Sequence, residues 1–169
     1  MTQRWLFIVI LIFALIGILD AGYLTMEHYS NEIPPCSTSP WVDCGKVLKS
    51  QYAQVGPIPV AVLGLTFYTS LFFLVITRLS LVRQLSFREK IWEKFQSLFG
   101  VARKWELSGF LKDLQLLMTI SAVLFSIYFV YLQLAVIHAI CLYCMVSAVN
   151  TILLFGVTFW ERFTLKFSN

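Results

Sequence analysis

Residues 140–160 read ICLYCMVSAVNTILLFGVTFW and contain no Asp, Glu, Lys or Arg. A bilayer core of about 30 Å is crossed by an α-helix of roughly 20 apolar residues. The stretch therefore predicts a membrane-spanning helix, and it places a Cys-Leu-Tyr-Cys motif in the first turn of that helix. An apolar span and a pair of cysteines at its start together suggest a membrane protein with thiol chemistry.

Three further apolar stretches meet the same length requirement. They cover residues 5–26, 60–77 and 114–136. The first exceeds the roughly 7–15 apolar residues of a signal peptide and has no clear cleavage site after it, so we expect a retained helix. Over the whole chain, 59% of residues are hydrophobic and 13% are charged, whereas soluble domains carry about 25% charged residues. The sequence predicts an all-α integral membrane protein, with four transmembrane helices in one domain over residues 1–169.

Basic residues are distributed unevenly between the segments that connect these spans. Within loop 27–59, the Lys and Arg residues are Lys46 and Lys49. All others lie in residues 1–4, 78–113 and 161–169. Because segments rich in Lys and Arg stay in the cytoplasm, we expect both termini to be cytoplasmic and the loop to be outside. The final residues FTLKFSN contain no basic endoplasmic-reticulum retention signal, which favours the plasma (inner) membrane of a prokaryote.

Segment 78–113 mixes its basic residues with apolar and aromatic ones at roughly helical spacing. The apolar positions are Leu81, Leu85, Ile91, Trp92, Phe95, Leu98, Phe99 and Trp105. This pattern is typical of an amphipathic helix that lies on anionic lipid. A docking site for a cytoplasmic partner is the alternative. We do not expect nucleic acid, because the membrane accounts for the basic residues.

All four cysteines fall on the side that this orientation places outside. Cys36 and Cys44 lie in the loop, and Cys141 and Cys144 begin the fourth span. Two cysteines three positions apart on a helix share a face and can form a bridge. That bridge closes too small a loop to contribute much stability, and a helix amino terminus favours a thiolate. The motif therefore indicates a redox centre, with a structural bridge or a metal site as alternatives.

The outer loop changes character at Cys44. Before it, prolines at 34, 35 and 40 predict extended, mobile chain around Cys36, with a thiol that a partner can reach. After it, apolar residues at helical spacing predict a short amphipathic helix on the membrane surface. The sequence GPIP at 56–59 then ends this helix and turns the chain into the second span. We expect the loop to cap the cysteines of the fourth span.

Three stretches together resemble the prokaryotic members of the vitamin K epoxide reductase family. They are VDCGKVLKSQYA at 42–53, PVAVLGLTFY at 59–68 and CLYC at 141–144. The resemblance extends over essentially the whole chain. Another quinone-linked family, the DsbB type, also has four spans and two cysteine pairs, but there the C-x-x-C pair lies in the first outer loop. In this chain the C-x-x-C pair comes last, so the order of the pairs favours the vitamin K epoxide reductase family over the DsbB type.

The resemblance implies a four-helix bundle around a quinone (ubiquinone, menaquinone or related), with the outer loop and its short helix capping the pocket. It implies that Cys144 faces the quinone, while Cys141 pairs with Cys144 and exchanges with Cys44. Cys36 then meets an external partner. The resemblance matches Ser50 to a serine of the family's loop helix that helps close the pocket, Gly64 and Tyr68 to positions on the second helix, and Asn150 to one on the fourth. Val60 and Ala148 match positions that contact the quinone, and all of these except Asn150 are candidate quinone-binding residues. For Gly64 close helix packing is an equal alternative, and Tyr68 is open to reading as an ordinary packed aromatic.

Val60 and Ala148 depart from the animal members, in which an asparagine and a tyrosine contact the vitamin K head group. The departure favours a simpler quinone over epoxide reduction. Polar residues near the outer ends of the first and third spans are further candidates for the pocket. They are Asp20, Tyr23, Tyr131 and Gln133. For Asp20 an interfacial position is the alternative.

The predicted activity is that of a quinone-dependent thiol-disulfide oxidoreductase that oxidises an extracytoplasmic thioredoxin-like protein of the DsbA type. The reductant is expected to be a separate protein. We expect a monomer in contact with membrane lipid and without a metal, because structural zinc sites usually combine two compact Cys or His pairs. One alternative is a four-span scaffold whose disulfides are structural. The other is a transporter with C-x-x-C as ligands, which requires polar residues deep within several spans.

Overall fold

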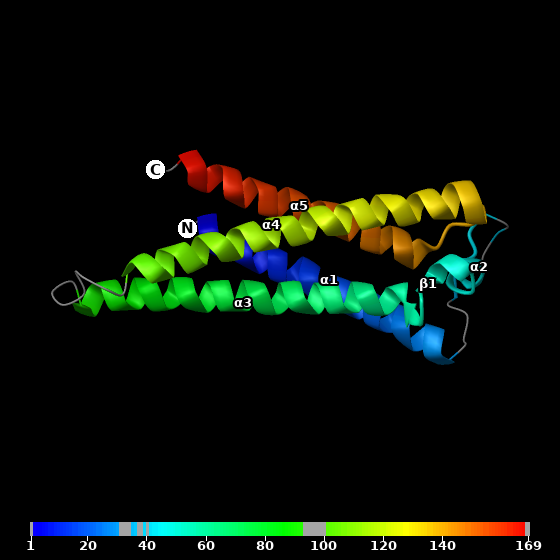
Figure 1. Cartoon of the computed structure of the whole chain (residues 1–169), viewed down its shortest axis with the longest axis horizontal. Helices are drawn as coiled ribbons and strands as arrows, with labels where there is room; N and C mark the ends of the chain where they lie inside the picture. The colour runs from blue at the N-terminus through cyan, green and yellow to red at the C-terminus, as the bar shows by residue number, and fades with distance from the viewer. Residues whose placement is uncertain (1, 31–34, 37–38, 40, 93–100, 168–169) are drawn as a thin grey trace.

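The structure is a computed structural model, which describes residues 2–30, 35–36, 39, 41–92 and 101–167. Four long helices run along its longest axis (Figure 1): α1 (Thr2–Ser30), α3 (Val60–Trp92), α4 (Val101–Tyr131) and α5 (Leu142–Phe167). Each contributes to a stretch long and apolar enough to cross a membrane, at Trp5–Ser30, Val60–Leu81, Gly109–Ile137 and Leu142–Phe163. The predicted all-α bundle of four membrane helices is confirmed.

The two ends of the bundle differ in what they contain. Both chain termini lie at one end, together with the last turns of α3 and the first turns of α4 (Figure 1). The short elements α2 (Cys44–Leu48) and β1 (Gln54–Val55) lie at the other end. We call these the terminal end and the cysteine end.

The helices pack around α1, which contacts both α3 and α5, while α4 packs mainly against α5. The buried core between α1, α3 and α5 contains Phe7, Ile10, Leu71, Val75 and Leu154. Many large apolar side chains instead point outward, and Phe73, for example, is 63% exposed. An apolar outer surface of this extent is stable against lipid tails rather than water.

The cysteine end is built from short elements between α1 and α3. Asp43 caps the amino terminus of α2, where its Oδ1 accepts a hydrogen bond from the Lys46 backbone N–H at 3.0 Å. A 3-10 turn, η1 (Gln51–Ala53), follows, and β1 then pairs with β2 (Ile58–Pro59) in a two-residue hairpin. Gly56 turns the hairpin with a φ of +63°, a conformation that glycine adopts without strain. The predicted short helix and turn are therefore present, with the helix divided into α2 and η1.

The connection from α4 to α5 has a geometry that the sequence does not indicate. α4 passes into a π-helical turn, η2 (Leu132–Ile137), and His138 follows in a left-handed conformation with φ of 52°. The Ala139 backbone N–H donates to the Gln133 carbonyl at 3.1 Å. π-Helical turns are rare and occur frequently at functional sites. This one delivers the chain to the start of α5 at the cysteine end.

The basic segment differs from its prediction. Residues 78–92 do not form a separate surface helix, because α3 continues without a break to Trp92. Likewise, residues 101–113 are the first turns of α4. Both long helices thus extend past their apolar stretches. The helical periodicity of the sequence does not show whether such a segment continues a long helix or forms a separate one. Residues 93–100 and the side chains of 82–108 lie outside the described part, so lipid binding by this segment stays a prediction.

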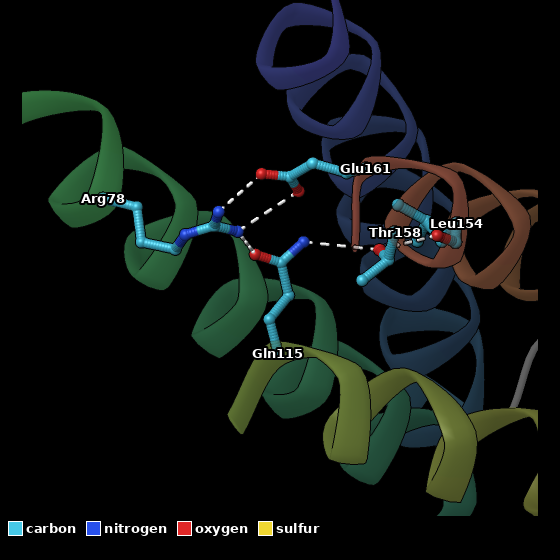
Figure 2. A network of polar contacts seen from close by, with 5 residues as sticks. All are labelled: Arg78, Gln115, Leu154, Thr158 and Glu161. Atoms are coloured by element: carbon cyan, nitrogen blue, oxygen red, sulfur yellow. Dashed lines mark hydrogen bonds and ion pairs between the residues drawn. The ribbon is translucent and has the colours of Figure 1, made fainter. Parts of the chain in front are cut away.

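A buried polar cluster joins three helices near the terminal end (Figure 2). Arg78 of α3 forms an ion pair with Glu161 of α5, with Nη2 and Oε1 2.5 Å apart. Arg78 also donates to the Gln115 side chain of α4, which in turn donates to Thr158 Oγ1 at 3.3 Å. All four residues are at most 5% exposed. We call these four residues the Arg78 cluster; the sequence suggested only that Arg78 ends a span.

Candidate functional site

Three of the four cysteine sulfur atoms meet at the cysteine end. Cys36 and Cys44 form a disulfide with a Cα–Cα distance of 5.7 Å, whereas Cys141 and Cys144 are free thiols. The Sγ atoms of Cys36, Cys44 and Cys141 all lie within 4.8 Å of one another. All three residues are buried. A free thiol thus lies directly beside a disulfide, which is the arrangement that thiol–disulfide exchange requires.

Backbone hydrogen bonds hold the loop against the start of α5. The Asp43 N–H donates to the Ile140 carbonyl at 3.1 Å, and the Ile140 N–H donates to the Trp41 carbonyl at 2.8 Å. From the other side, the Cys141 N–H donates to Gln133 Oε1 at 2.8 Å. Main-chain pairing of residues 41–43 with Ile140 therefore positions Cys44 beside Cys141. The approach of these two cysteines does not depend on side-chain rotamers alone.

Cys141 is the better nucleophile of the motif by its surroundings. The Cys144 backbone N–H donates to Cys141 Sγ at 3.4 Å, at the amino terminus of α5. A hydrogen bond from the Cys144 side chain lowers the pKa of the Cys141 thiol, with help from backbone N–H groups. Burial and the negative charge of Asp20 act in the opposite direction. The balance lowers the pKa of Cys141 below its ordinary value, which increases the fraction present as thiolate, the reactive form in exchange.

Cys36 is less accessible than its sequence predicts. The prolines around it indicated mobile chain with a thiol open to a partner, but Cys36 is 4% exposed. It packs in one apolar cluster with Cys44, Val47, Ala139 and Cys141. Burial of the bonded sulfur atoms accounts for the difference, because a disulfide is apolar and is stabilised by such a cluster. In this state the Cys36 side chain is therefore covered.

A cavity of about 410 Å³ lies beneath the loop, between the four long helices. Most of its lining is apolar, and residues of α2 and η1 close it at the cysteine end. Cys144 lines the cavity, whereas Cys141 does not. The two thiols of the motif thus have different surroundings: Cys141 faces the loop disulfide, and Cys144 faces the cavity.

The structure places most of the candidate pocket residues around this cavity. Those that line it are Asp20, Ser50, Val60, Gly64, Tyr68, Gln133 and Ala148. Tyr131 lies elsewhere, because its position on α4 turns its side chain outward and leaves it 60% exposed. Tyr23 is also absent from the lining. Whether the lining residues contact a quinone stays a prediction.

Tyr68 is fixed in place by packing and by hydrogen bonds. Its hydroxyl group bonds to Thr151 Oγ1 at 2.8 Å and to Ser147 Oγ at 3.0 Å. Its ring covers Gly17 of α1 so closely that a Cβ atom there would overlap it. The packing interpretation of Tyr68 therefore holds, and the same ring also forms part of the cavity wall. Gly64 has more room, because a Cβ there would lie 3.6 Å from the Ala21 side chain.

Two residues of the site were not identified in their present roles from sequence. Gln133, a candidate for the pocket, also anchors the Cys141 backbone through its side chain. Asn150 donates from Nδ2 to the Phe13 carbonyl at 3.0 Å and links α5 to α1 beneath the cavity. The sequence signals are a polar residue in an apolar span for both and, for Asn150, the match to a family position on the fourth helix; neither signal reveals the hydrogen-bond partner.

The fold and the site define an integral membrane protein with a disulfide and a reactive thiol in exchange distance. The model of the vitamin K epoxide reductase family matches residues 8–159, so the chain belongs to this family. A search of curated proteins found no match. Membership in the family implies a membrane thiol-disulfide oxidoreductase, and the arrangement of the cysteines agrees with that activity.

Proposed function

We propose that the protein oxidises the dithiol of a thioredoxin-like partner and passes the electrons to a membrane quinone. The observation that carries this proposal is the separation of the two free thiols. Cys141 Sγ lies within 4.8 Å of the loop disulfide, while Cys144 lines a largely apolar cavity. Cys141 thus faces the loop disulfide with which it can exchange, and Cys144 faces a cavity suited to an apolar electron acceptor.

The cavity suits a quinone by size and chemistry. Its volume of about 410 Å³ lies within the range of roughly 300–1,000 Å³ typical of small-molecule sites. Ser50, Val60, Gly64, Tyr68 and Ala148 would hold the ring beside Cys144. Val60 and Ala148 offer apolar surface there rather than hydrogen bonds, which favours a simple quinone. When bound, the quinone accepts two electrons and two protons.

Electrons enter through the loop pair. A partner thiolate attacks Cys36 of the Cys36–Cys44 disulfide, and Cys44 leaves as a thiolate. The second partner thiol then attacks the mixed disulfide, which releases an oxidised partner and a reduced Cys36. Each step exchanges one S–S bond for another and conserves electrons.

The loop pair next reduces the helical pair. The Cys44 thiolate attacks Cys141 of an oxidised Cys141–Cys144 pair, and Cys144 leaves as a thiolate, which takes up the proton of the Cys36 thiol. Cys36 then attacks Cys44, which restores the loop disulfide and frees Cys141. The structure has this pattern of bonds: Cys36–Cys44 joined, with Cys141 and Cys144 free. The reduced Cys141–Cys144 pair beside the cavity then holds the two electrons that the quinone accepts.

The proposed orientation puts the cysteine end outside and the terminal end in the cytoplasm of a prokaryotic inner membrane. The distribution of Lys and Arg between loop 27–59 and the other connecting segments supports it. Thiol labelling of intact cells with a membrane-impermeant reagent tests the side. Reaction of reduced Cys36 from outside is the expected result, and protection until the cells are lysed would contradict it.

The test of the relay is a trapped intermediate. In Cys36→Ala, Cys44 has no resolving thiol, so oxidation should accumulate a Cys44–Cys141 bridge, detected by mass spectrometry of unreduced peptides. The matched control is the double variant Cys36→Ala, Cys141→Ala, in which this bridge has no second sulfur. Absence of the bridge from the single variant, with no quinol formed by the wild type, contradicts the proposal. Disulfides that stay unchanged on quinone addition would instead support the scaffold alternative.

A further inference from the structure

Asp20 lines the cavity together with Cys144 but has no part in the electron path. Its Oδ2 atom is buried and has no hydrogen-bond partner among the described residues. Burial of an unpaired carboxylate in apolar surroundings is costly. Ionisable residues within membrane spans commonly mark routes for ions or protons. The position of Asp20, at the wall of the cavity, therefore points to a proton function.

A second, smaller cavity adjoins the first and leads toward exposed residues. Its volume is about 210 Å³, and it shares His28, Leu48 and Ser50 with the larger cavity. Glu27, Lys49 and Gln54 give it a polar lining. Glu27 Oε2 is, like Asp20 Oδ2, buried without a hydrogen-bond partner in the described part of the chain. We call this smaller cavity the vestibule.

One face of α1 connects the two cavities. Asp20, Tyr23 and Glu27 are three and four positions apart, so their side chains follow one another along the same side of the helix. Seven residues of α-helix span about 10 Å. Tyr23 lies between them in sequence, and its ring packs against that of Tyr143 with the centroids 5.1 Å apart. Glu27 in the vestibule lining and Asp20 in the cavity lining therefore lie on one face of α1, with Tyr23, which lines neither cavity, between them.

The electron balance at Cys141 requires such a supply of protons. When Cys141 is a thiolate, the reaction is Cys141–S⁻ + Cys144–SH + quinone + H⁺ → Cys141–S–S–Cys144 + quinol. The S–S bond forms as both sulfur atoms together give up two electrons, which reduce the two quinone carbonyl groups. Cys144 releases one proton, and the second must come from water. A mostly apolar cavity offers few groups that can deliver it.

We propose that Asp20 is the proton-transfer residue of the cavity, where its carboxyl group passes a proton from water in the vestibule to a quinone oxygen. The inference rests on the proposed function. Asp20 acquires the next proton from water on the side of the vestibule, where Glu27 lies on the same face of α1, and its carboxylate is restored to the acid form for another turnover.

The test compares Asp20→Asn with Asp113→Asn in the full chain, reconstituted in lipid nanodiscs. Asp113 is a matched control because it lies in another membrane span, and its ion pair with Arg162 is half exposed and away from the cavity. Quinol formation is followed in a single turnover from the reduced Cys141–Cys144 pair. Loss of general acid catalysis predicts a rate about 100-fold lower for Asp20→Asn. Asp20→Glu keeps the carboxyl group and should recover most of the rate.

A second measurement needs no quinone. Titration of thiolate absorbance in quinone-free protein reports the pKa of Cys141, whose thiolate faces Asp20 of α1 and Cys144 and Tyr143 of α5. Removal of the Asp20 charge should lower this pKa, because that charge opposes the thiolate. A residue that acted by charge alone would then leave Asp20→Asn with more thiolate and a faster turnover. A lower pKa together with a slower turnover is the combination expected of a proton-transfer residue.

The outcomes separate this inference from the proposed function. If wild-type protein forms no quinol, the proposed function fails. If the wild type is active but Asp20→Asn behaves as Asp113→Asn does in turnover or in the titration, the proton-transfer role is wrong and the relay stands. A faster Asp20→Asn also contradicts it.

Discussion

At the terminal end Arg78 bonds to both carboxylate oxygens of Glu161 and to the Gln115 side chain, whereas at the cysteine end Asp20 and Glu27 each keep a buried oxygen without a partner among the described residues. Both ends place polar groups inside an apolar bundle. The hydrogen-bonded groups hold three helices together, whereas the unpartnered groups include Asp20, for which we propose a role in proton transfer. The comparison predicts that substitutions at the terminal end mainly lower stability, whereas substitutions at the cysteine end mainly lower activity.

The largest effect should come from Cys144→Ser, which removes the thiol that lines the cavity. Quinol formation should fall at least about 10⁴-fold, as for other residues that carry the bond changes of a reaction. The unfolding transition in detergent should stay close to that of the wild type, because serine fills nearly the same volume. Activity is read as quinol absorbance and stability as thermal unfolding. Substantial quinol formation by the variant would show that Cys141 alone serves the cavity.

The converse change is Arg78→Met at the terminal end. It leaves Glu161 buried without its arginine partner, a type of change that costs about 3–5 kcal/mol. We expect a clear fall in the unfolding midpoint, while quinol formation per folded molecule stays near the wild-type rate at a permissive temperature. A variant that is stable but inactive would refute the division of roles between the two ends.

Gly17→Ala tests the packing of helices between the two ends. A Cβ atom at this position would overlap the Tyr68 ring, which hydrogen bonds prevent from moving away. Overpacking of this kind typically costs about 1–3 kcal/mol. The matched control is Gly22→Ala on the same helix, where the nearest atom, Leu65 Cδ1, would lie at 3.9 Å. Thermal unfolding should separate the two, and equal midpoints would contradict the close approach of α1 and α3.

The smallest effect should come from Asp113→Asn, which breaks the ion pair with Arg162. Its atoms are 2.5 Å apart, the same distance as between Arg78 and Glu161, but its side chains are 46% and 53% exposed. Exposed ion pairs contribute about 0–1 kcal/mol, since solvent screens them. The unfolding midpoint should therefore hardly change. A loss as large as that of Arg78→Met would mean that burial does not distinguish the two pairs.

The helices could be predicted because length and apolar composition specify a membrane span before any packing is known. The CLYC motif and the family resemblance likewise identified the cysteines. The Arg78 cluster could not be predicted, because an arginine at the end of a span gives the same signal whether it faces lipid head groups or a buried glutamate. Tyr131 shows a related limit: its place in the sequence is near the cavity, but the rotation of α4 turns it outward.

Two further features depend on contacts between distant segments. The burial of Cys36 arises from packing against Ala139 and Cys141, which its proline-rich neighbours do not reveal. The π-helical turn η2 and the bond from Cys141 to Gln133 are likewise set by how the α4–α5 connection meets the loop. Local sequence patterns describe each segment alone, so they miss geometry that appears only when the segments meet.

The main-chain pairing between residues 41–43 and Ile140 has a consequence for selectivity. It makes the loop disulfide a tethered reagent for Cys141, and well-oriented groups held in this way react as if present at about 10⁵–10⁸ M. Small thiols dissolved in the surrounding water reach only millimolar levels and find the same sulfur atoms covered by apolar side chains. The main-chain pairing therefore favours exchange between the loop disulfide and Cys141 over exchange with small thiols dissolved in water.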